Sequence, residues 1–178
     1  MWNEEDHPRE PKGTSGGGRF IARVNNADEL VDYVRMVLNG EEVPQRVAFG
    51  GIGERERTAI ETLIGEPLNA NCHTIAKTEI IHINKDHGGN GRTDRSMSDL
   101  SDYGKILDAI QGFDEIKLLY KNGEVKRSWA YRDKYNKGAR LVQFKKKMDN
   151  DNFYVVEMLT DGKDGDIKVL SAYQNAKK

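Results

Sequence analysis

The stretch Glu115-Ile-Lys-Leu-Leu-Tyr-Lys-Asn122-Gly123-Glu-Val-Lys-Arg-Ser-Trp-Ala-Tyr131 marks the change from helical to strand-like sequence in this chain of 178 residues. Asn-Gly between two runs of strand-forming residues is a strong signal for a β-hairpin with a tight turn. In the second run, apolar and polar residues alternate, which predicts one shared face for Val125, Arg127, Trp129 and Tyr131. Trp129 is expected in the core, and a ring available for stacking is the alternative.

Further strands are predicted beyond this hairpin at residues 140–148, 153–159 and 166–173, separated by turns rich in Asn, Asp and Gly. Four to five consecutive strands of this kind indicate an antiparallel meander. On the last strand, the period of two predicts that Ser171 and Tyr173 share a face with Ile167 and Val169.

Before residue 115 the apolar residues mostly recur with a helical period. We expect helices at residues 26–38, 54–64, 77–87 and 98–111, and short strands at residues 19–24 and 46–49. The predicted fold class is therefore α+β, with N-terminal helices packed on a C-terminal four- to five-stranded antiparallel sheet.

The chain is predicted to have three parts. Residues 1–18 have the Gly, Pro and charged composition of a flexible linker. Residues 19–70 are expected to form a small N-terminal α/β annex, and residues 71–178 the main α+β domain.

The composition limits the functional classes. Hydrophobic residues make up 37% and charged residues 32% of the chain, which is enough for one modest core. The single cysteine, Cys72, excludes an internal disulfide and a multi-cysteine zinc site. No segment has the pattern of a signal peptide or of a membrane span.

Positive charge is concentrated in the C-terminal part. Residues 115–178 hold 15 Lys and Arg against 9 Asp and Glu, although the whole chain has a net charge of −1. Such an excess favours binding to a phosphate backbone, and a solvated sheet face is the alternative.

The run Glu79-Ile-Ile-His82-Ile-Asn-Lys85-Asp-His87-Gly88-Gly89 contains two of the four histidines. In a helix, His87 lies on the apolar side at the C-terminus, where the macrodipole favours an imidazolium. This position suits a general acid or base, and a histidine that only caps the helix is the open alternative. His82 and His87 are five residues apart, a poor spacing for a shared metal, so no metal site is predicted. His73 is expected on a loop or strand edge, without a role.

The motif around His82 and His87, with the helices near it and a meander that ends in Ser171-Ala-Tyr173, resembles a known family. It is similar to the phage-associated branch of the barnase–EndoU–colicin–RelE superfamily of metal-independent ribonucleases. The resemblance covers roughly residues 45–175 of this chain. It makes residues 71–178 the ribonuclease-like domain.

The resemblance implies an RNA-cleaving toxin domain that needs no cofactor. In that chemistry a 2′-hydroxyl attacks the adjacent phosphate and leaves a cyclic phosphate. The helix motif makes His87 the leading acid–base residue, and His82 and Lys85 belong to the same motif. The family also supplies a cationic and a hydroxyl residue from its strands, for which this chain offers Arg127 and either Ser171 or Tyr173.

Basic residues on the strands are candidates for binding the flanking phosphates: Lys126, Arg140, Lys145 and Lys147. The expected partners are RNA, with transfer RNA as one candidate, and an immunity or antitoxin protein; no membrane partner is expected. The expected site of action is the bacterial cytoplasm, with a virion-associated or delivered protein as the alternative.

Two other functions stay open. The first is a nucleic-acid-binding or virion-associated accessory module without catalysis, and the second is an NAD-using toxin that modifies proteins. RNA binding without cleavage would indicate the first, and NAD consumption the second.

Overall fold

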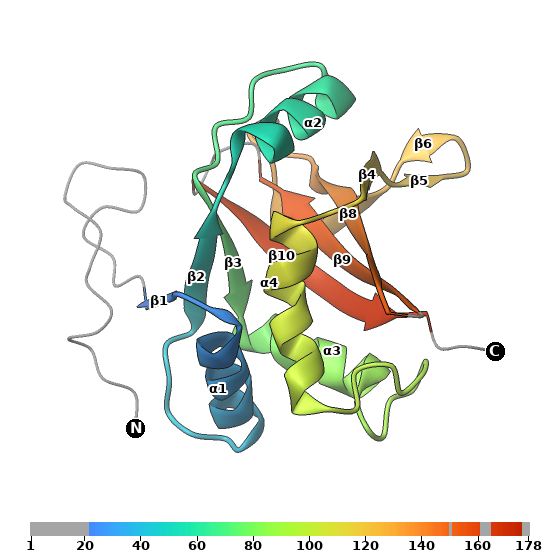
Figure 1. Ribbon diagram of the computed structural model, residues 1–178. Helices are drawn as coiled ribbons and strands as arrows, with labels where there is room; N and C mark the ends of the chain where they lie inside the picture. Colours follow the sequence, from blue (N-terminus) through green and yellow to red (C-terminus); the bar gives the residue numbers. More distant parts are fainter. Residues whose placement is uncertain (1–21, 150, 161–164, 176–178) are drawn as a thin grey trace.

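The computed structural model describes residues 22–149, 151–160 and 165–175, and a twisted mixed sheet crosses its centre (Figure 1). The predicted linker, residues 1–18, lies outside the described residues. The sheet has eight strands in the spatial order β1-β2-β3-β10-β9-β8-β4, and β7 pairs with β8 as well. The pairs β1–β2 and β3–β10 are parallel, and the other pairs are antiparallel.

The strand bounds are β1 (Ala22–Val24), β2 (Arg46–Gly51), β3 (Cys72–Ala76), β4 (Glu115–Leu118), β7 (Arg127–Arg132), β8 (Gly138–Met148), β9 (Asp151–Leu159) and β10 (Asp166–Gln174). A separate two-stranded hairpin is formed by β5 (Tyr120–Lys121) and β6 (Glu124–Val125). The helices are α1 (Ala27–Leu38), α2 (Glu54–Ile64), α3 (Lys77–His87), the 3-10 helix η2 (Leu100–Gly104) and α4 (Lys105–Gln111).

Several local predictions are confirmed. Helix α1 begins after Asn26, whose side chain accepts a hydrogen bond from the backbone N–H of Glu29 at 2.9 Å. Helix α2 ends at Gly65, which has the left-handed conformation (φ 71°) that glycine adopts without strain. The hairpin turn at Asn122-Gly123 also has positive φ at both residues, as a tight hairpin turn requires.

The fold class α+β is confirmed, but the predicted order of helices followed by a sheet is wrong. The described residues contain ten strands, and three of them, β1, β2 and β3, alternate with α1 and α2 before α3 begins. These short strands join the C-terminal strands through the pairing of β3 with β10. Because that pairing is set by residues distant in sequence, local periodicity did not reveal it.

The sheet runs across the boundary predicted near residue 70, which separates the annex from the main domain. Strands β1 and β2 pair with each other, and β2 pairs with β3. The division of the chain into an annex and a main domain stays a prediction.

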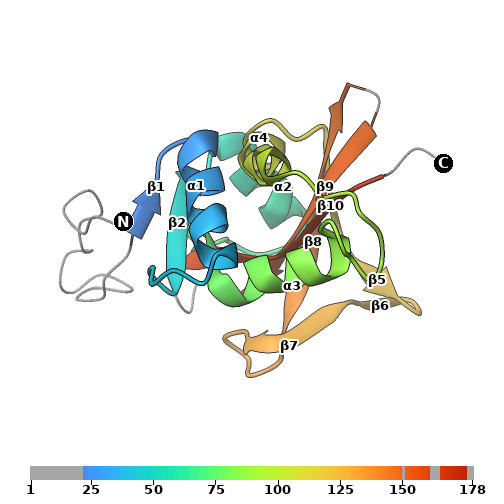
Figure 2. The same ribbon diagram turned by 90° about the horizontal axis from the view of Figure 1, so that it is seen from below.

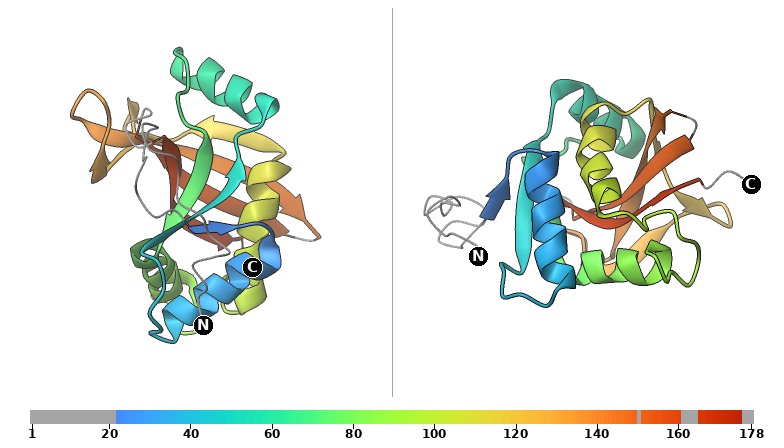
Figure 3. Two further views of the ribbon diagram at one scale, coloured as in Figure 1. Left: turned by 90° about the vertical axis from the view of Figure 1, so that its left-hand side faces the viewer. Right: turned by 60° about the horizontal axis from the view of Figure 1, so that its bottom comes forward.

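Helices cover one face of the sheet and leave most of the other face open. Helix α4 crosses in front of the sheet in Figure 1, and α1 lies beside the lower end of α4 in the left view of Figure 3. The larger core lies between helices and sheet and includes Phe49, Phe144 and Phe153. A smaller cluster on the opposite face contains Leu141 and Met158 and is partly covered by Tyr131 of β7.

A buried ion triad lies within the larger core. The His73 imidazole is fully buried on β3, and its Nε2 lies 2.6 Å from Oε1 of Glu56 on α2. Its Nδ1 lies 2.8 Å from Oε2 of Glu157 on β9. Phe49 stacks on the ring, and Phe144 meets it edge-on. The prediction that His73 lies on a loop or strand edge is therefore wrong, since β3 is an interior strand.

The carboxylates keep this imidazole protonated. Burial by itself would lower the pKa of His73, but Glu157 and Glu56 outweigh it and raise the pKa to about 10. Burial also raises the pKa of Glu157 to about 7, against the opposing charge of His73. Both groups therefore bind protons more tightly in the folded chain than in the unfolded chain.

We expect the free energy of unfolding to fall as the pH rises. The contribution of Glu157 is present below its ordinary pKa of 4.5 and is lost as the pH passes about 7. That of His73 is present below its ordinary pKa of 6.5 and is lost as the pH approaches 10. Urea denaturation across this range measures the change.

The double variant Glu56→Gln/Glu157→Gln is the comparison. Burial alone then acts on His73 and lowers its pKa, so the fall in stability above pH 6.5 should disappear. Glu66→Gln serves as the matched control, because Glu66 lies outside the triad and its pKa is lowered by Arg140. Parallel pH profiles for the wild type and the double variant would contradict the prediction.

Candidate active site

The site begins where β3 is shorter than its neighbour β10. Strand β3 pairs only with the first residues of β10, from Asp166 to Lys168. Helix α3 follows β3 directly and packs beside the rest of β10, along the lower side of the molecule in Figure 2. The last residue of α3, His87, therefore lies beside Tyr173 near the end of β10, and the two rings stack with centroids 5.4 Å apart.

A β-bulge decides which face of the sheet Tyr173 occupies. The register of β10 against β9 shifts between Val169 and Ser171. Ile167 and Val169 point into the larger core, whereas Tyr173 packs against the smaller cluster on the open face. The prediction that Ser171 and Tyr173 share a face with Ile167 and Val169 is wrong, because the extra residue reverses the alternation.

The loop after α3 folds back onto the end of the helix. The backbone N–H groups of Arg92, Thr93 and Met97 donate to the carbonyl oxygens of Lys85, Asp86 and His87 at 3.0, 2.9 and 2.7 Å. These bonds satisfy carbonyls that a helix C-terminus leaves unpaired. They also bring Asp94 next to the imidazole of His87.

Asp94 orients the His87 ring. Nδ1 of His87 lies 3.0 Å from Oδ1 of Asp94, a close polar contact without the alignment of a regular hydrogen bond. Burial alone would raise the pKa of Asp94, but hydrogen bonds from Ser96 and the contact with His87 outweigh it and lower the pKa. An ionised carboxylate at Nδ1 leaves Nε2 as the nitrogen available for proton transfer. The His87 side chain is 12% exposed.

From His87 a row of side chains crosses the open face of the sheet. Tyr173 is paired with Tyr154 of β9, and Tyr154 with Lys145 of β8. The two tyrosine rings stack with centroids 5.2 Å apart. Neighbouring strands lie about 4.8 Å apart, so Lys145 stands roughly 10 Å from Tyr173 along the row. We call His87, Tyr173, Tyr154 and Lys145 the open-face row.

Gln143 positions the hydroxyl group of Tyr173. Nε2 of Gln143 donates to this hydroxyl at 2.8 Å, which leaves the phenolic proton for another acceptor. Burial, together with the neighbouring Tyr154, raises the pKa of Tyr173, so the phenol is neutral at physiological pH. Ser171 lies one position back on the same face, opposite Val156 of β9.

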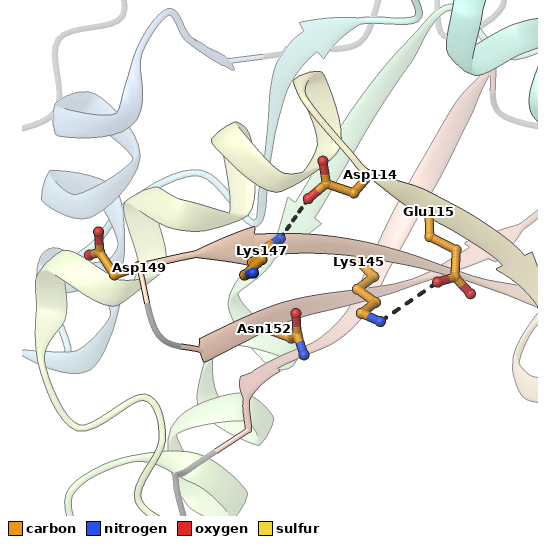
Figure 4. A pocket seen from close by; sticks show the side chains of 6 residues that line it. All are labelled: Asp114, Glu115, Lys145, Lys147, Asp149 and Asn152. Carbon is orange, nitrogen blue, oxygen red and sulfur yellow. Dashed lines mark hydrogen bonds and ion pairs between the residues drawn. The ribbon is translucent and has the colours of Figure 1, made fainter.

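A hollow of about 530 Å³ adjoins the lysine end of the row (Figure 4). Lys145 and Lys147 line it from β8, together with Asn152 of β9 and with Asp114, Glu115 and Asp149. The ammonium group of Lys145 lies 3.7 Å from a carboxylate oxygen of Glu115, an exposed pair of low energy. Two of the predicted phosphate-binding lysines are thus beside the candidate site.

Two predicted arginines lie elsewhere. Arg127 on β7 donates to the carbonyl of Gly138 at 2.8 Å and pairs with buried Asp133 at 3.2 Å. Arg140 is paired with Glu66 at 2.8 Å on the helix-covered side. The structure does not bring either guanidinium into the open-face row.

The other predicted residues are exposed around the site. His82 is half-exposed on α3 and lies 3.2 Å from Asp86, and Lys85 is exposed on the same helix. Lys126 is exposed between β6 and β7. Trp129, which was expected in the core, is 64% exposed, because the β7–β8 register shifts between Ser128 and Arg132.

Sequence reasoning missed three residues of the site: Asp94, Gln143 and Tyr154. Tyr154 and Gln143 lie within predicted strands, and alternation alone could have placed each on a face. No local pattern showed that the open face of the sheet would carry the site. Asp94 lies in a polar loop and meets His87 only through the hydrogen bonds that fold this loop back.

The described residues contain no group of three or more His, Cys, Asp or Glu side chains suited to a metal ion. The helices in the described part of the chain are all too short or too polar to cross a membrane.

Comparison with models of protein families identifies one match. Residues 50–178 match the family described as phage-Barnase-EndoU-ColicinE5/D-RelE like nuclease3. The matched segment contains every residue of the open-face row, and it confirms the resemblance predicted from the histidine motif. Neither a curated protein nor a solved structure matches the chain.

We expect Gly91→Ala to displace the loop that holds Asp94. A Cβ atom at Gly91 would overlap the carbonyl oxygens of Asp94 and Asp86, so the loop must move away from α3. The variant should lose about 1–3 kcal/mol of stability. Hydrogen exchange at the amides of Arg92 and Thr93 should become faster.

Gly89→Ala is the matched control, because a Cβ atom at Gly89 meets nothing within 4 Å. Its stability should stay within about 0.5 kcal/mol of the wild type. Equal effects of the two substitutions would mean that the folded-back loop does not have the packing described.

Proposed function

The chain belongs to the phage-Barnase-EndoU-ColicinE5/D-RelE like nuclease3 family, and from this membership we propose that it cleaves RNA as a toxin-like, metal-independent endoribonuclease. The observation that carries the proposal is the oriented imidazole of His87, which stacks on Tyr173 at one end of the open-face row. Lys145 stands in the same row, on the face of the sheet that the helices leave open.

The proposed reaction is a transesterification. His87 removes the proton of a ribose 2′-hydroxyl, and the oxygen attacks the adjacent phosphorus. The bond from phosphorus to the 5′-oxygen breaks, this oxygen takes a proton from solvent, and a 2′,3′-cyclic phosphate remains. Tyr173 donates its phenolic proton in a hydrogen bond to a phosphate oxygen, and Gln143 holds the hydroxyl in place.

Negative charge that develops on the phosphate needs a nearby cation. Lys145 fits this role better than Arg127, because Lys145 has only an exposed, long contact with Glu115, whereas Arg127 is bound to buried Asp133. Lys147 beside it suits a flanking phosphate. Ser171, His82 and Lys85 remain candidates for secondary contacts with the ribose or phosphate.

The proposed substrate is RNA within a bacterial cell, with transfer RNA as one candidate. A producing cell would need an immunity or antitoxin protein to cover the open-face row.

We expect His87→Ala to lower the rate of RNA cleavage by about 10²- to 10⁴-fold, because the variant lacks the general base. Tyr173→Phe should lower it less, since the ring packing stays and only the hydroxyl is lost. Cleavage of total RNA in EDTA, with analysis of the products for cyclic phosphate termini, measures both effects.

Asp108→Ala provides the control, because Asp108 is exposed on α4, which covers the opposite face of the sheet. The variants His82→Ala and Lys145→Ala are assayed in parallel. The first measures the effect of the other imidazole of α3 on the cleavage rate, and the second the effect of the proposed cation. Cleavage that persists in His87→Ala would remove this residue from the mechanism. RNA binding without cleavage by the wild type would favour an accessory module.

A further inference from the structure

Exposed aromatic side chains are concentrated in one part of the fold. Four large apolar side chains are more than half exposed among the described residues, and three of them lie between residues 120 and 135: Tyr120 (61%), Trp129 (64%) and Tyr135 (60%). We call residues 120–137, which form the β5–β6 hairpin, β7 and the following turn, the aromatic arm. In Figure 2 its strands project beyond the body of the sheet.

The Trp129 ring packs against β8 although most of its surface is open. A Cβ atom on Gly138 would lie 3.0 and 3.1 Å from two atoms of the indole, so the ring rests directly on the backbone of β8. The guanidinium carbon of Arg132 lies 5.2 Å from the ring centroid. An aromatic ring that already packs on the protein loses less conformational entropy than a free one when a planar ligand stacks on it.

The charge of the arm is positive. Its outward cations are Lys121, Lys126, Arg132, Lys134 and Lys137, and Glu124 is the one exposed carboxylate in this range. The other acid, Asp133, is buried and paired with Arg127. Cations interleaved with exposed rings suit a ligand with flat faces and a regular negative charge.

Tyr131 links the arm to the open-face row. Its hydroxyl accepts a hydrogen bond from Arg46, and the ammonium of Lys168 lies 5.2 Å from its ring centroid. The ring also packs in the same cluster as Leu170 and Tyr173. A chain bound at His87 could therefore continue along the arm without leaving the protein surface.

We propose that the aromatic arm binds a single-stranded segment of RNA next to the cleaved bond. Unpaired bases stack on Trp129 and Tyr120, and Lys126 and Arg132 contact the phosphates. This inference rests on the proposed function and deepens it, since it makes unpaired RNA the preferred substrate. Tyr135 is not included, because its hydroxyl lies 3.4 Å from Glu66.

RNA fits this surface better than a protein partner does. The centre of a protein interface is rich in Tyr, Trp and Arg but depleted in lysine, whereas the arm exposes four lysines among its rings. The exposed apolar groups of the arm are aromatic rings, and two of them have a cation over the ring face. Stacking on such rings tolerates any base sequence, which suits a segment beside a cleavage site.

The test measures binding in the His87→Ala background, so that the RNA stays intact. The ligands are a fluorescent single-stranded oligoribonucleotide, a duplex of the same length and an abasic strand with the same phosphates. Trp129→Ala should weaken single-strand binding about tenfold and leave duplex and abasic binding unchanged. Trp129→Phe should restore most of the affinity. Ile81→Ala, which removes an exposed apolar side chain without a ring, should have no effect.

Salt dependence separates the two contributions. Trp129→Ala should leave the slope of log affinity against log salt unchanged, whereas Arg132→Ala should reduce it by about one. Equal single-strand binding by Trp129→Ala and the parent would overturn the proposal and leave the surface to a protein partner. Equal loss for single-stranded, duplex and abasic ligands would overturn it as well.

Cleavage of a dinucleotide distinguishes failure of this inference from failure of the proposed function. A dinucleotide spans the cleaved bond without reaching the arm, so otherwise wild-type enzyme with Trp129→Ala should cleave it at the normal rate. The same enzyme should show a raised KM for a long single strand. A normal KM for the long strand would contradict RNA binding by the aromatic arm and leave the proposed role of His87 intact. Loss of dinucleotide cleavage would show that Trp129 acts on the fold or on the site itself, which would also contradict the inference.

Discussion

A single extra residue in β10 determines on which face of the sheet this protein presents its candidate site. The side chains of a strand alternate with a period of two, so one inserted residue moves every later side chain to the other face. The bulge between Val169 and Ser171 sends Tyr173 to the open face, while Ile167 and Val169 stay in the core. Without it, Tyr173 would point among the helices, and His87 would have no ring to stack on.

The ends of the elements complete this arrangement. Because the pairing of β3 with β10 stops at Lys168, α3 can occupy the space next to the second half of β10. The helix therefore ends with its last residue at the open face, and the loop after it supplies the carboxylate of Asp94. The site is thus assembled from a helix terminus, a loop and three strands, and each part has a separate structural cause.

Among the described histidines, His73 and His87 show how environment divides one side-chain type into two roles. His73 lies between two buried carboxylates, which raise its pKa, and its contacts with them belong to the stability of the core. His87 has one carboxylate partner and one ring nitrogen directed away from it, which suits reversible proton transfer. The same distinction applies to the cations, since Arg127 and Arg140 hold the fold together through Asp133 and Glu66. Lys145 and Lys147, beside the hollow, are better suited to a ligand.

What the sequence alone determined is local. The bounds of α3, the cap at Asn26, the stop at Gly65 and the turn at Asn122-Gly123 follow from helical period, capping and turn chemistry, which act over a few residues. The motif in α3 also predicted the nuclease family, and the family match confirms it. The catalytic role of His87 stays a proposal. Three features were decided by the tertiary structure alone. They are the bulge before Ser171, the burial of His73 with Glu157, 84 residues away, and the parallel pairing of β3 with β10. These features depend on contacts between segments that are distant in sequence. Such contacts do not change the local periodicity of the sequence.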